Sequence, residues 1–265
     1  MITGYSNIIS VTTSSFDADA AAFFARVTAA GGTLSLTEKT ATNQLVLDMK
    51  TNGIWSSMKA IYPMVGASAA ACAQNLKSSS FTGTFTSGWT FASSGVTGNG
   101  TSAYMDSTLI PNTSLGVNSG HFSVYSRTNI EDLSSDFGSE SAGTSNQQII
   151  LARYTGLGFV STYGSYSAAS NSPNTDSRGF FITNRNSTTN SSAFKNNTKV
   201  LDYPITGSLS TKTLLLAADN GTSSIIRFSA RQYAFASIGD GLTDTQASNF
   251  YTAVQTFQTT LSRNV

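Results

Sequence analysis

Histidine and cysteine, two side chains that often take part in catalysis, each occur once in this 265-residue chain, as His121 and Cys72. A Ser-His-Asp triad would need His121, but no serine of the sequence lies in a Gly-x-Ser-x-Gly elbow. We expect His121 to be an exposed side chain at the start of a strand. Cys72 lies in the alanine-rich run 69–73, where we expect a small buried side chain rather than a nucleophile.

Acidic side chains gather in a serine-rich segment that carries Glu131, Asp132, Asp136 and Glu140. Hydrolysis of a glycoside needs two carboxyl groups about 5 to 10 Å apart, and we find no pair that suggests it. The alternative for this segment is a calcium site, which needs about six to eight oxygen ligands. We favour the interpretation as a solvated loop. We therefore predict no catalytic residue, no metal site, no cofactor and no enzymatic activity.

Three tyrosines form the remaining candidate site: Tyr154, Tyr163 and Tyr166. They lie in a stretch rich in glycine and serine that has few other large side chains. Exposed tyrosines stack on sugar rings or form the aromatic centre of a protein interface. Alternation within a sheet would explain the three residues equally well. We predict them as carbohydrate-binding residues.

The composition limits the classes of partner. Only 11% of the residues are charged, against about 25% in a typical protein, and the net charge is +1. Neither nucleic acid nor an anionic membrane surface is an expected partner, because both require a basic patch. We also expect no secretory signal and no membrane-spanning segment. A surface of hydroxyls and amides suits neutral partners such as glycans, or further copies of the chain.

The pattern that organises the chain is a pair of strands within residues 89–128. Gly98, Asn99 and Gly100 form a turn signal, a short strand follows at 104–107, and polar and apolar residues alternate over 121–128. Short strands separated by turn residues continue to about residue 240, which is typical of a sandwich. The other predicted strands are 81–85, 89–91, 136–138, 147–154, 158–163, 179–185, 192–195, 199–200, 213–219 and 225–238.

Helices are predicted at both ends of the sandwich. The first begins near Ser15 or Asp17 and ends at Gly31 and Gly32, and the second runs from Thr37 to Gly53. A third apolar stripe over residues 54–61 predicts a further short helix that Pro63 ends. Residues 1–15, which carry Ile8, Ile9 and Val11, are expected to be an extended arm that contacts another chain.

The C-terminal segment predicts an amphipathic helix. Thr243 and Gln246 have the spacing of a capping box, and an apolar stripe follows at steps of three and four residues. The stripe consists of Ala247, Phe250, Tyr251, Val254, Phe257 and Leu261. Because the connection from the last strand is short, we expect this helix to pack on its own domain, together with the first helical region.

The layout resembles the concanavalin A-like and laminin-G-like jelly-roll domains. The residues that carry this resemblance are the first core strand, 98–105, and the step from Phe122 to Val124. A hairpin at Asn196 and Asn197 matches a turn in which laminin-G-like domains usually have Asn-Gly. The resemblance implies an antiparallel jelly-roll sandwich with a small N-terminal helical region and a C-terminal helix. We expect the chain to divide into the extended arm 1–15, a helical region 16–75 packed on the sandwich, and the sandwich itself, 76–265.

Taken together, several segments are similar to a module of tailed-bacteriophage virion proteins. They are residues 16–20, 53–55, 58–63, 98–101, 125–129, 235–244 and 249–261. The resemblance implies a non-enzymatic structural subunit of the phage particle, such as a capsid decoration protein or a head or tail fibre or adaptor subunit. Its partners would be other virion proteins and copies of itself, and it would be assembled in the bacterial cytoplasm.

Adhesion to a glycan of the host surface is compatible with such a role. The alternatives are a stand-alone carbohydrate-binding module and a polysaccharide depolymerase. The depolymerase is the weaker alternative, because the sequence lacks an evident pair of catalytic carboxyl groups.

Overall fold

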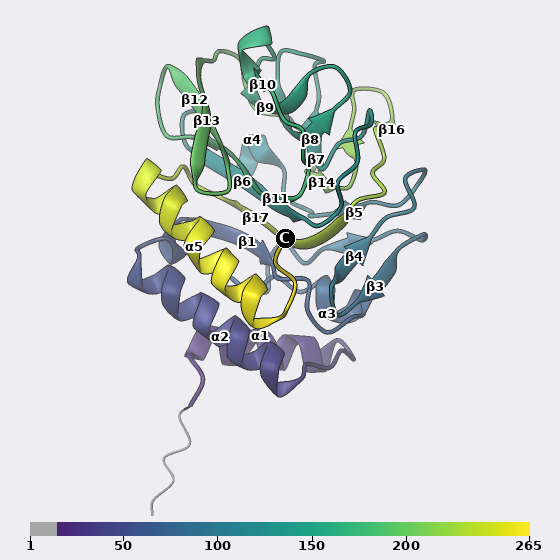
Figure 1. Ribbon diagram of the computed structural model, residues 1–265, viewed down its shortest axis with the longest axis vertical. Helices are drawn as coiled ribbons and strands as arrows, with labels where there is room; N and C mark the ends of the chain where they lie inside the picture. The colour runs from purple at the N-terminus through teal and green to yellow at the C-terminus, as the bar shows by residue number, and fades with distance from the viewer. Residues whose placement is uncertain (1–14) are drawn as a thin grey trace, which may run out of the picture.

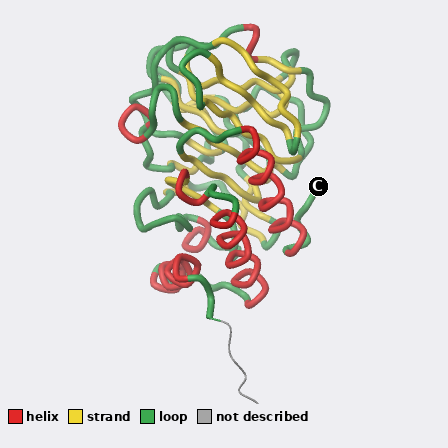
Figure 2. The backbone as a smooth tube through the Cα atoms, turned by 90° about the vertical axis from the view of Figure 1, so that its left-hand side faces the viewer, coloured by secondary structure: helices red, strands yellow, loops and turns green. Residues whose placement is uncertain are grey.

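The computed structural model describes residues 15–265, so residues 1–14 of the predicted arm lie outside the described part of the chain. Within the described residues the strands form two facing sheets, and helices cover the outer face of one of them (Figures 1 and 2). The predicted jelly-roll sandwich of antiparallel sheets is confirmed.

The first sheet is the one that the helices cover. Its strands are β1 (Met58–Tyr62), β3 (Thr90–Ala92), β4 (Gly95–Thr97), β6 (Gly120–Ser126), β11 (Gly179–Arg185), β12 (Asn190–Lys195), β13 (Thr198–Pro204) and β17 (Gln232–Gly239). They follow the order β13-β12-β11-β6-β17-β4-β3, and β1 pairs with β17 beside this path. The predicted turn between β12 and β13 is confirmed, since Asn196 has a φ of 53° there.

The second sheet carries the candidate site described below. Its strands are β2 (Thr84–Phe85), β5 (Met105–Asp106), β7 (Phe137–Glu140), β8 (Gln147–Tyr154), β9 (Gly158–Gly164), β10 (Asn171–Ser172), β14 (Leu215–Leu216), β15 (Asp219–Asn220) and β16 (Ile225–Ile226). The order is β10-β9-β8-β7-β14-β5-β2. β15 pairs with β16 and also, in a parallel arrangement, with β7.

Strand β6 shows why the first sheet is buried on both faces. Phe122 and Val124 point into the core between the two sheets, whereas Tyr125 belongs to the cluster beneath the helices. Because successive side chains of a strand point to opposite faces, one strand supplies both clusters. All residues of β6 are buried as a result.

The helices at the two ends of the chain pack together over this sheet. They are α1 (Ala18–Ala29), α2 (Leu36–Thr51) and α5 (Asp244–Thr260), and α2 and α5 lie side by side in Figure 1. The capping box of α5 is present as predicted, with Thr243 and Gln246, and α2 begins with a second one. Phe250, Val254 and Phe257 are buried in the same cluster as the N-terminal helices. The expected intramolecular packing of the C-terminal helix is confirmed.

The remaining helical segments are short. They are η1 (Trp55–Ser57), α3 (Ala69–Cys72), α4 (Pro111–Ser114) and η2 (Ala168–Ser170). No helix within residues 15–265 is long and apolar enough to cross a membrane.

The predicted third helix at 54–61 is wrong. Only η1 is helical there, and β1 follows it and pairs with β17, with Ile61 opposite Ser237. Met58 and Ile61 contact the helices, whereas Ala60 and Tyr62 reach the inter-sheet core. A strand that is apolar on both faces lacks alternation, so its pattern resembles that of a buried helix.

Two long predicted strands are each interrupted by a residue with a positive φ. The predicted strand 213–219 is divided at Ala217, which has a φ of 64°, into β14 and β15. The predicted strand 225–238 is divided after β16 by Arg227, which has a φ of 56°. Neither break could be predicted, because alanine and arginine are not turn-forming residues and seldom adopt this conformation.

Candidate ligand-binding groove

The outer face of β8 and β9 carries an apolar cluster that is separate from the sandwich core. On β8, Ile150 and Ala152 face the core, whereas Ile149 and Leu151 face outward. Val160 of β9 joins the two outward residues, and Tyr154 and Tyr166 pack against them. Strand alternation therefore places an apolar floor on the face of the second sheet that points away from the core.

Two tyrosines turn this floor into a groove with a volume of about 240 Å³. Tyr154 and Tyr166 are half-buried and pack against the floor, and the floor residues Ile149, Leu151 and Val160 are 2 to 6% exposed. The groove is lined by Thr144, Gln147, Ile149, Leu151, Tyr154, Leu157, Val160, Thr162, Tyr166 and Arg227. Ligand sites commonly combine an apolar, aromatic lining with a few polar groups of this kind.

Tyr163, the third predicted sugar-binding tyrosine, lies on the other face of β9. It is fully buried between the sheets, its ring is 6.3 Å from that of Phe122, and its hydroxyl donates to the Gly116 carbonyl at 2.8 Å. Tyr163 cannot contact a ligand in the groove, so this part of the prediction is wrong. Its neighbour Thr162 lines the groove instead, and we did not predict it.

Tyr166 is held in place by two hydrogen bonds, one through its backbone and one through its side chain. Its N–H donates to the Thr144 carbonyl at 2.8 Å, and its hydroxyl accepts from Asn171 Nδ2 at 3.1 Å. The first bond ties the segment after β9 to the loop before β8, and the second ties the Tyr166 side chain to β10.

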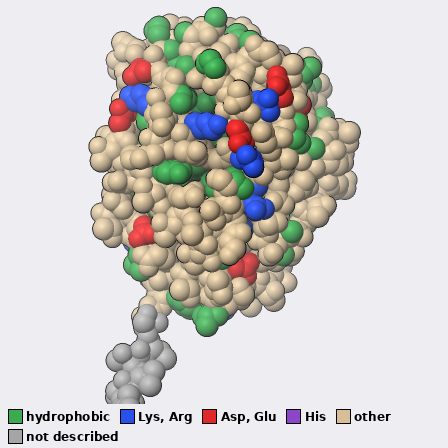
Figure 3. All heavy atoms as spheres, viewed as in Figure 1, with side chains coloured by type: hydrophobic (Ala, Val, Ile, Leu, Met, Phe, Trp, Pro, Cys, Tyr) green, Lys and Arg blue, Asp and Glu red, His purple; other side chains and the backbone are tan. Residues whose placement is uncertain are grey.

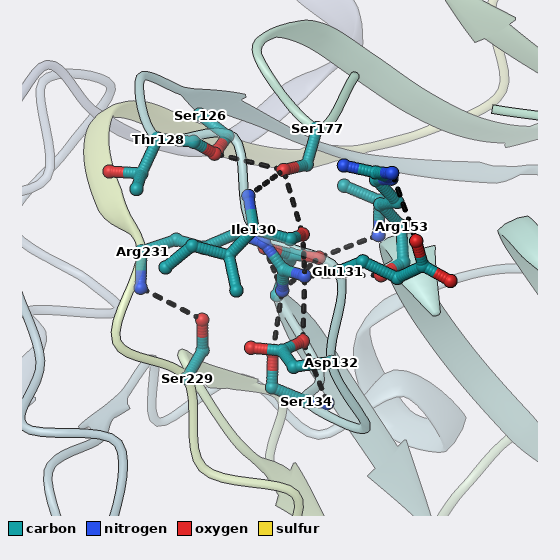
Figure 4. A network of polar contacts seen from close by, with 12 residues as sticks. Ser126, Thr128, Ile130, Glu131, Asp132, Ser134, Arg153, Ser177, Ser229 and Arg231 are labelled. Atoms are coloured by element: carbon teal, nitrogen blue, oxygen red, sulfur yellow. Dashed lines mark hydrogen bonds and ion pairs between the residues drawn. The ribbon is translucent and has the colours of Figure 1, made fainter. Parts of the chain in front are cut away.

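The buried Arg231 fixes the chain around Tyr154, and Figure 4 shows its guanidinium among the residues that it contacts. The Arg231 guanidinium lies between the 130–134 segment and the end of β8, and its Nη2 donates to the Ile130 carbonyl at 2.9 Å, Asp132 Oδ1 at 2.7 Å and the Arg153 carbonyl at 3.2 Å. Thr155 N–H then donates to the Asp132 carbonyl at 2.9 Å. These contacts fix the chain on both sides of Tyr154.

The Arg231 charge is balanced by Asp136, which is also fully buried. The Asp136 carboxylate lies 3.3 Å from Arg231 Nη1 and accepts from Ala152 N–H at 2.6 Å and from the Tyr233 hydroxyl at 2.8 Å. Burial raises the pKa of Asp136, whereas Arg231 and these donors oppose that rise. Asp136 and Glu140 are both buried, so the interpretation of the acidic segment as a solvated loop is wrong for these two residues.

Arg227 contributes a cation to the groove. Its Nη1 is 2.5 Å from Asp219 Oδ2, and the Asp219 side chain is fully buried. Burial, followed by the charge of Glu140, raises the pKa of Asp219 to about 7, although Arg227 acts in the opposite direction. Sequence analysis missed Arg227, because the residue was assigned to a continuous strand.

His121 is fully buried, which contradicts the expected exposed position. Its Nδ1 donates to the Asp240 carbonyl at 2.6 Å, and its ring meets Phe250 edge-on at 6.0 Å. Burial lowers the pKa of His121 to about 4, so the ring is neutral at ordinary pH and has a packing role. Cys72 is a buried free thiol, as expected.

Among residues 15–265, no group of three or more histidine, cysteine, aspartate or glutamate side chains is placed to hold a metal ion. A second groove, of about 520 Å³, lies where the α1–α2 loop meets the end of α5. It has no aromatic side chain and is lined by Thr33, Ser35, Thr37, Glu38, Gly66, Ala67, Ser93, Thr260, Leu261 and Ser262.

The hydroxyl of Thr162 has no hydrogen-bond partner although the side chain is 0% exposed. We expect Thr162→Val to raise the free energy of unfolding by about 1 kcal/mol, because an unsatisfied buried hydroxyl is removed. Ser161→Ala on the same strand is the control. It breaks the 2.7 Å bond to the Thr183 hydroxyl and should lower that free energy by a similar amount. Urea denaturation measures both, and a destabilised Thr162→Val would show that the hydroxyl is satisfied.

Comparison with known proteins gives distant similarities only. No family model matches the chain, and no curated protein matches it. A structure of domain 4 of AbnA, a GH43 extracellular arabinanase from Geobacillus stearothermophilus in complex with arabinotriose, is 11% identical, with a TM-score of 0.46 over 73% of this chain and 98% of that domain. A structure of botulinum neurotoxin type C, in a study of its dependence on two ganglioside molecules for cell entry, is 11% identical, with a TM-score of 0.46 over 77% of this chain and 53% of that one.

The NanB sialidase of Streptococcus pneumoniae is 15% identical, with a TM-score of 0.39 over 51% of this chain. The match spans only 24% of the sialidase chain. Nothing in these comparisons supports a phage virion origin, and the sequence resemblance to virion modules stays a hypothesis. Similarities at this level do not assign a function, and the chain belongs, by its own strands and sheets, to the antiparallel β-sandwich class.

Proposed function

We propose that this protein is a non-catalytic carbohydrate-binding domain that holds a sugar between Tyr154 and Tyr166. The observation that carries the proposal is the groove itself, in which two tyrosines pack against an apolar floor and Thr162 has an unpartnered hydroxyl. The apolar face of a sugar ring would pack on the aromatic rings. Its hydroxyls would meet the few polar groups of the lining, which fix the orientation of a ligand.

The burial and the contacts of the carboxyl groups near the groove support binding of a sugar without cleavage of its glycosidic bond. Asp219 is buried against Arg227, and Glu140 is buried and accepts a hydrogen bond from the Gln147 amide. Neither residue lines the groove. A glycosidase needs two carboxyl groups that flank the scissile bond, and these two contact protein groups instead.

A glycan array tests the proposal. The wild-type chain should bind at least one saccharide, and Tyr154→Ala or Tyr166→Ala should weaken its binding by about 1.5 kcal/mol, roughly tenfold in Kd, because a stacking surface is lost. Tyr104→Ala is the control, since Tyr104 is half-buried beside Phe228 and does not line the groove. Binding that survives both groove substitutions would place the sugar elsewhere. Release of reducing ends from a polysaccharide would instead favour a depolymerase.

A structural role in a phage virion is the second candidate, and the sequence resemblance along most of the chain favours it. Charged side chains are few and scattered on the face drawn in Figure 3, which suits close packing against other subunits. Mass spectrometry of purified particles from the corresponding phage tests this role. Absence of the chain from intact particles would exclude it and leave the carbohydrate-binding role unaffected.

A further inference from the structure

We propose that the groove selects saccharides that carry a carboxylate, and that Arg227 is the residue that selects them. The proposal rests on the carbohydrate-binding function and names the class of sugar. Among the described residues that line the groove, Arg227 is the only one with a formal charge. An acidic sugar seated between Tyr154 and Tyr166 would therefore have a cation beside it.

The Arg227 guanidinium retains donors for a ligand. A guanidinium has several N–H groups in a planar fork, and Nη1 is the one that contacts Asp219 Oδ2. The side chain is 30% exposed and lines the groove. That fork matches the two oxygens of a carboxylate, which a lysine or an amide cannot match as well.

The protein also keeps this arginine charged and fixed. Burial lowers the pKa of Arg227, but the charges of Asp219 and Glu140 and the nearby Tyr154 hydroxyl together raise it above its usual value. The backbone is in the left-handed region, with a φ of 56°, and the Arg227 carbonyl accepts from Ser135 N–H at 2.7 Å. A bulky residue seldom adopts this conformation, so the surrounding contacts must hold the Arg227 backbone in place.

Thr162 provides a second, independent indication of a ligand. Its side chain is 0% exposed, its hydroxyl is unpartnered, and it lines the same groove as Arg227. Buried hydroxyls are normally satisfied. A sugar oxygen would satisfy this one while the carboxylate of the same sugar meets Arg227.

The test compares neutral and acidic saccharides on one array, with neutral hexose oligomers, uronic-acid oligomers and sialylated oligosaccharides printed together. The full-length wild-type chain should prefer acidic saccharides. Arg227→Gln should weaken their binding by about tenfold or more and weaken the binding of neutral saccharides by a clearly smaller factor, because a neutral sugar loses a polar contact there but no ion pair. Arg227→Lys should retain part of the preference, because it keeps the charge and loses the fork.

Two further variants show whether a loss of binding by Arg227→Gln comes from the lost ion pair or from misfolding. Arg227→Gln leaves Asp219 buried without its partner, so the double variant Arg227→Gln/Asp219→Asn removes both charges and should show the same loss. Asp219→Asn alone keeps the arginine and removes the competing anion, so it should bind acidic saccharides at least as well as the wild type.

The pH dependence gives a second readout. Asp219 faces Glu140 of β7, Arg227 and Lys212, and burial raises the pKa of Asp219 to about 7. Lowering the pH from about 8 to about 6 should protonate Asp219 and remove a negative charge beside the bound carboxylate. Acidic saccharides should then bind several-fold more tightly, neutral ones should not, and Asp219→Asn should show no such change. Equal affinity of the wild type for an acidic saccharide at both pH values, together with no tighter binding by Asp219→Asn, would contradict a carboxylate placed here.

The outcomes separate this inference from the function on which it rests. If the wild type binds neutral and acidic saccharides equally, or if Arg227→Gln weakens both to the same extent, the inference is wrong and the carbohydrate-binding function stands. If it binds no saccharide at all, the proposed function fails and this inference fails with it.

Discussion

Phe250→Ala is expected to lower the free energy of unfolding by about 3 to 5 kcal/mol, the usual cost of emptying a buried phenylalanine site. Phe250 is fully buried, and its ring is 5.2 Å from that of Phe180 and 5.9 Å from that of Phe235. It therefore joins the last helix to the central strands of the first sheet. The cavity would lie under α5, where rigid strands limit collapse around it.

Thr256→Ala on the exposed face of α5 is the matched control and should change the free energy of unfolding by less than about 0.5 kcal/mol. Urea denaturation of both variants measures the difference. If Phe250→Ala is as stable as the wild type and only self-association changes, α5 serves an interface between chains and the intramolecular packing described above is wrong.

Arg231→Met is expected to cost about 3 to 5 kcal/mol, because it leaves Asp136 as an unpaired charge in the protein interior. Both side chains are fully buried, and Arg231 also holds the 130–134 segment against the end of β8. The substitution should therefore loosen Tyr154 as well as lower stability. The double variant Arg231→Met/Asp136→Asn should recover part of the loss, since the unpaired charge is absent.

Arg178→Met provides the contrast for this prediction. Arg178 pairs with Asp176 at 2.7 Å, but its side chain is 49% exposed, and exposed ion pairs contribute little to stability because solvent screens them. Thermal and urea denaturation should therefore show a small effect for Arg178→Met and a large one for Arg231→Met. Equal effects of the two substitutions would show that the buried pair has no special role in stability.

Local signals in the sequence predicted the parts of the fold that depend on neighbouring residues. The capping box at Thr243, the turn at Asn196 and the bounds of β8 and β11 each follow from a few adjacent residues. The prediction of a sandwich followed from the density of short strands along the sequence. The packing of α5 on its own domain followed from the short connection after β17.

The errors arise where both faces of a strand are buried or where partners are distant in sequence. In β9, Phe159 and Val160 are adjacent and both apolar, so the pattern does not show which face Tyr163 takes. Asp136 seemed solvated because its partner Arg231 lies 95 residues away. Arg227 enters the groove through a backbone conformation that its residue type disfavours, and no local pattern indicates it.

The central claim, that the groove between Tyr154 and Tyr166 binds a saccharide, is tested most directly by mapping the bound sugar on the isotope-labelled chain. The saccharide that binds most tightly on the array is titrated, and the shifted backbone resonances in the NMR spectrum are assigned. We expect the shifts to cluster in β8, β9 and the segments that carry Tyr166 and Arg227. Shifts confined to the second groove, beside Glu38 and Thr260, would contradict the claim.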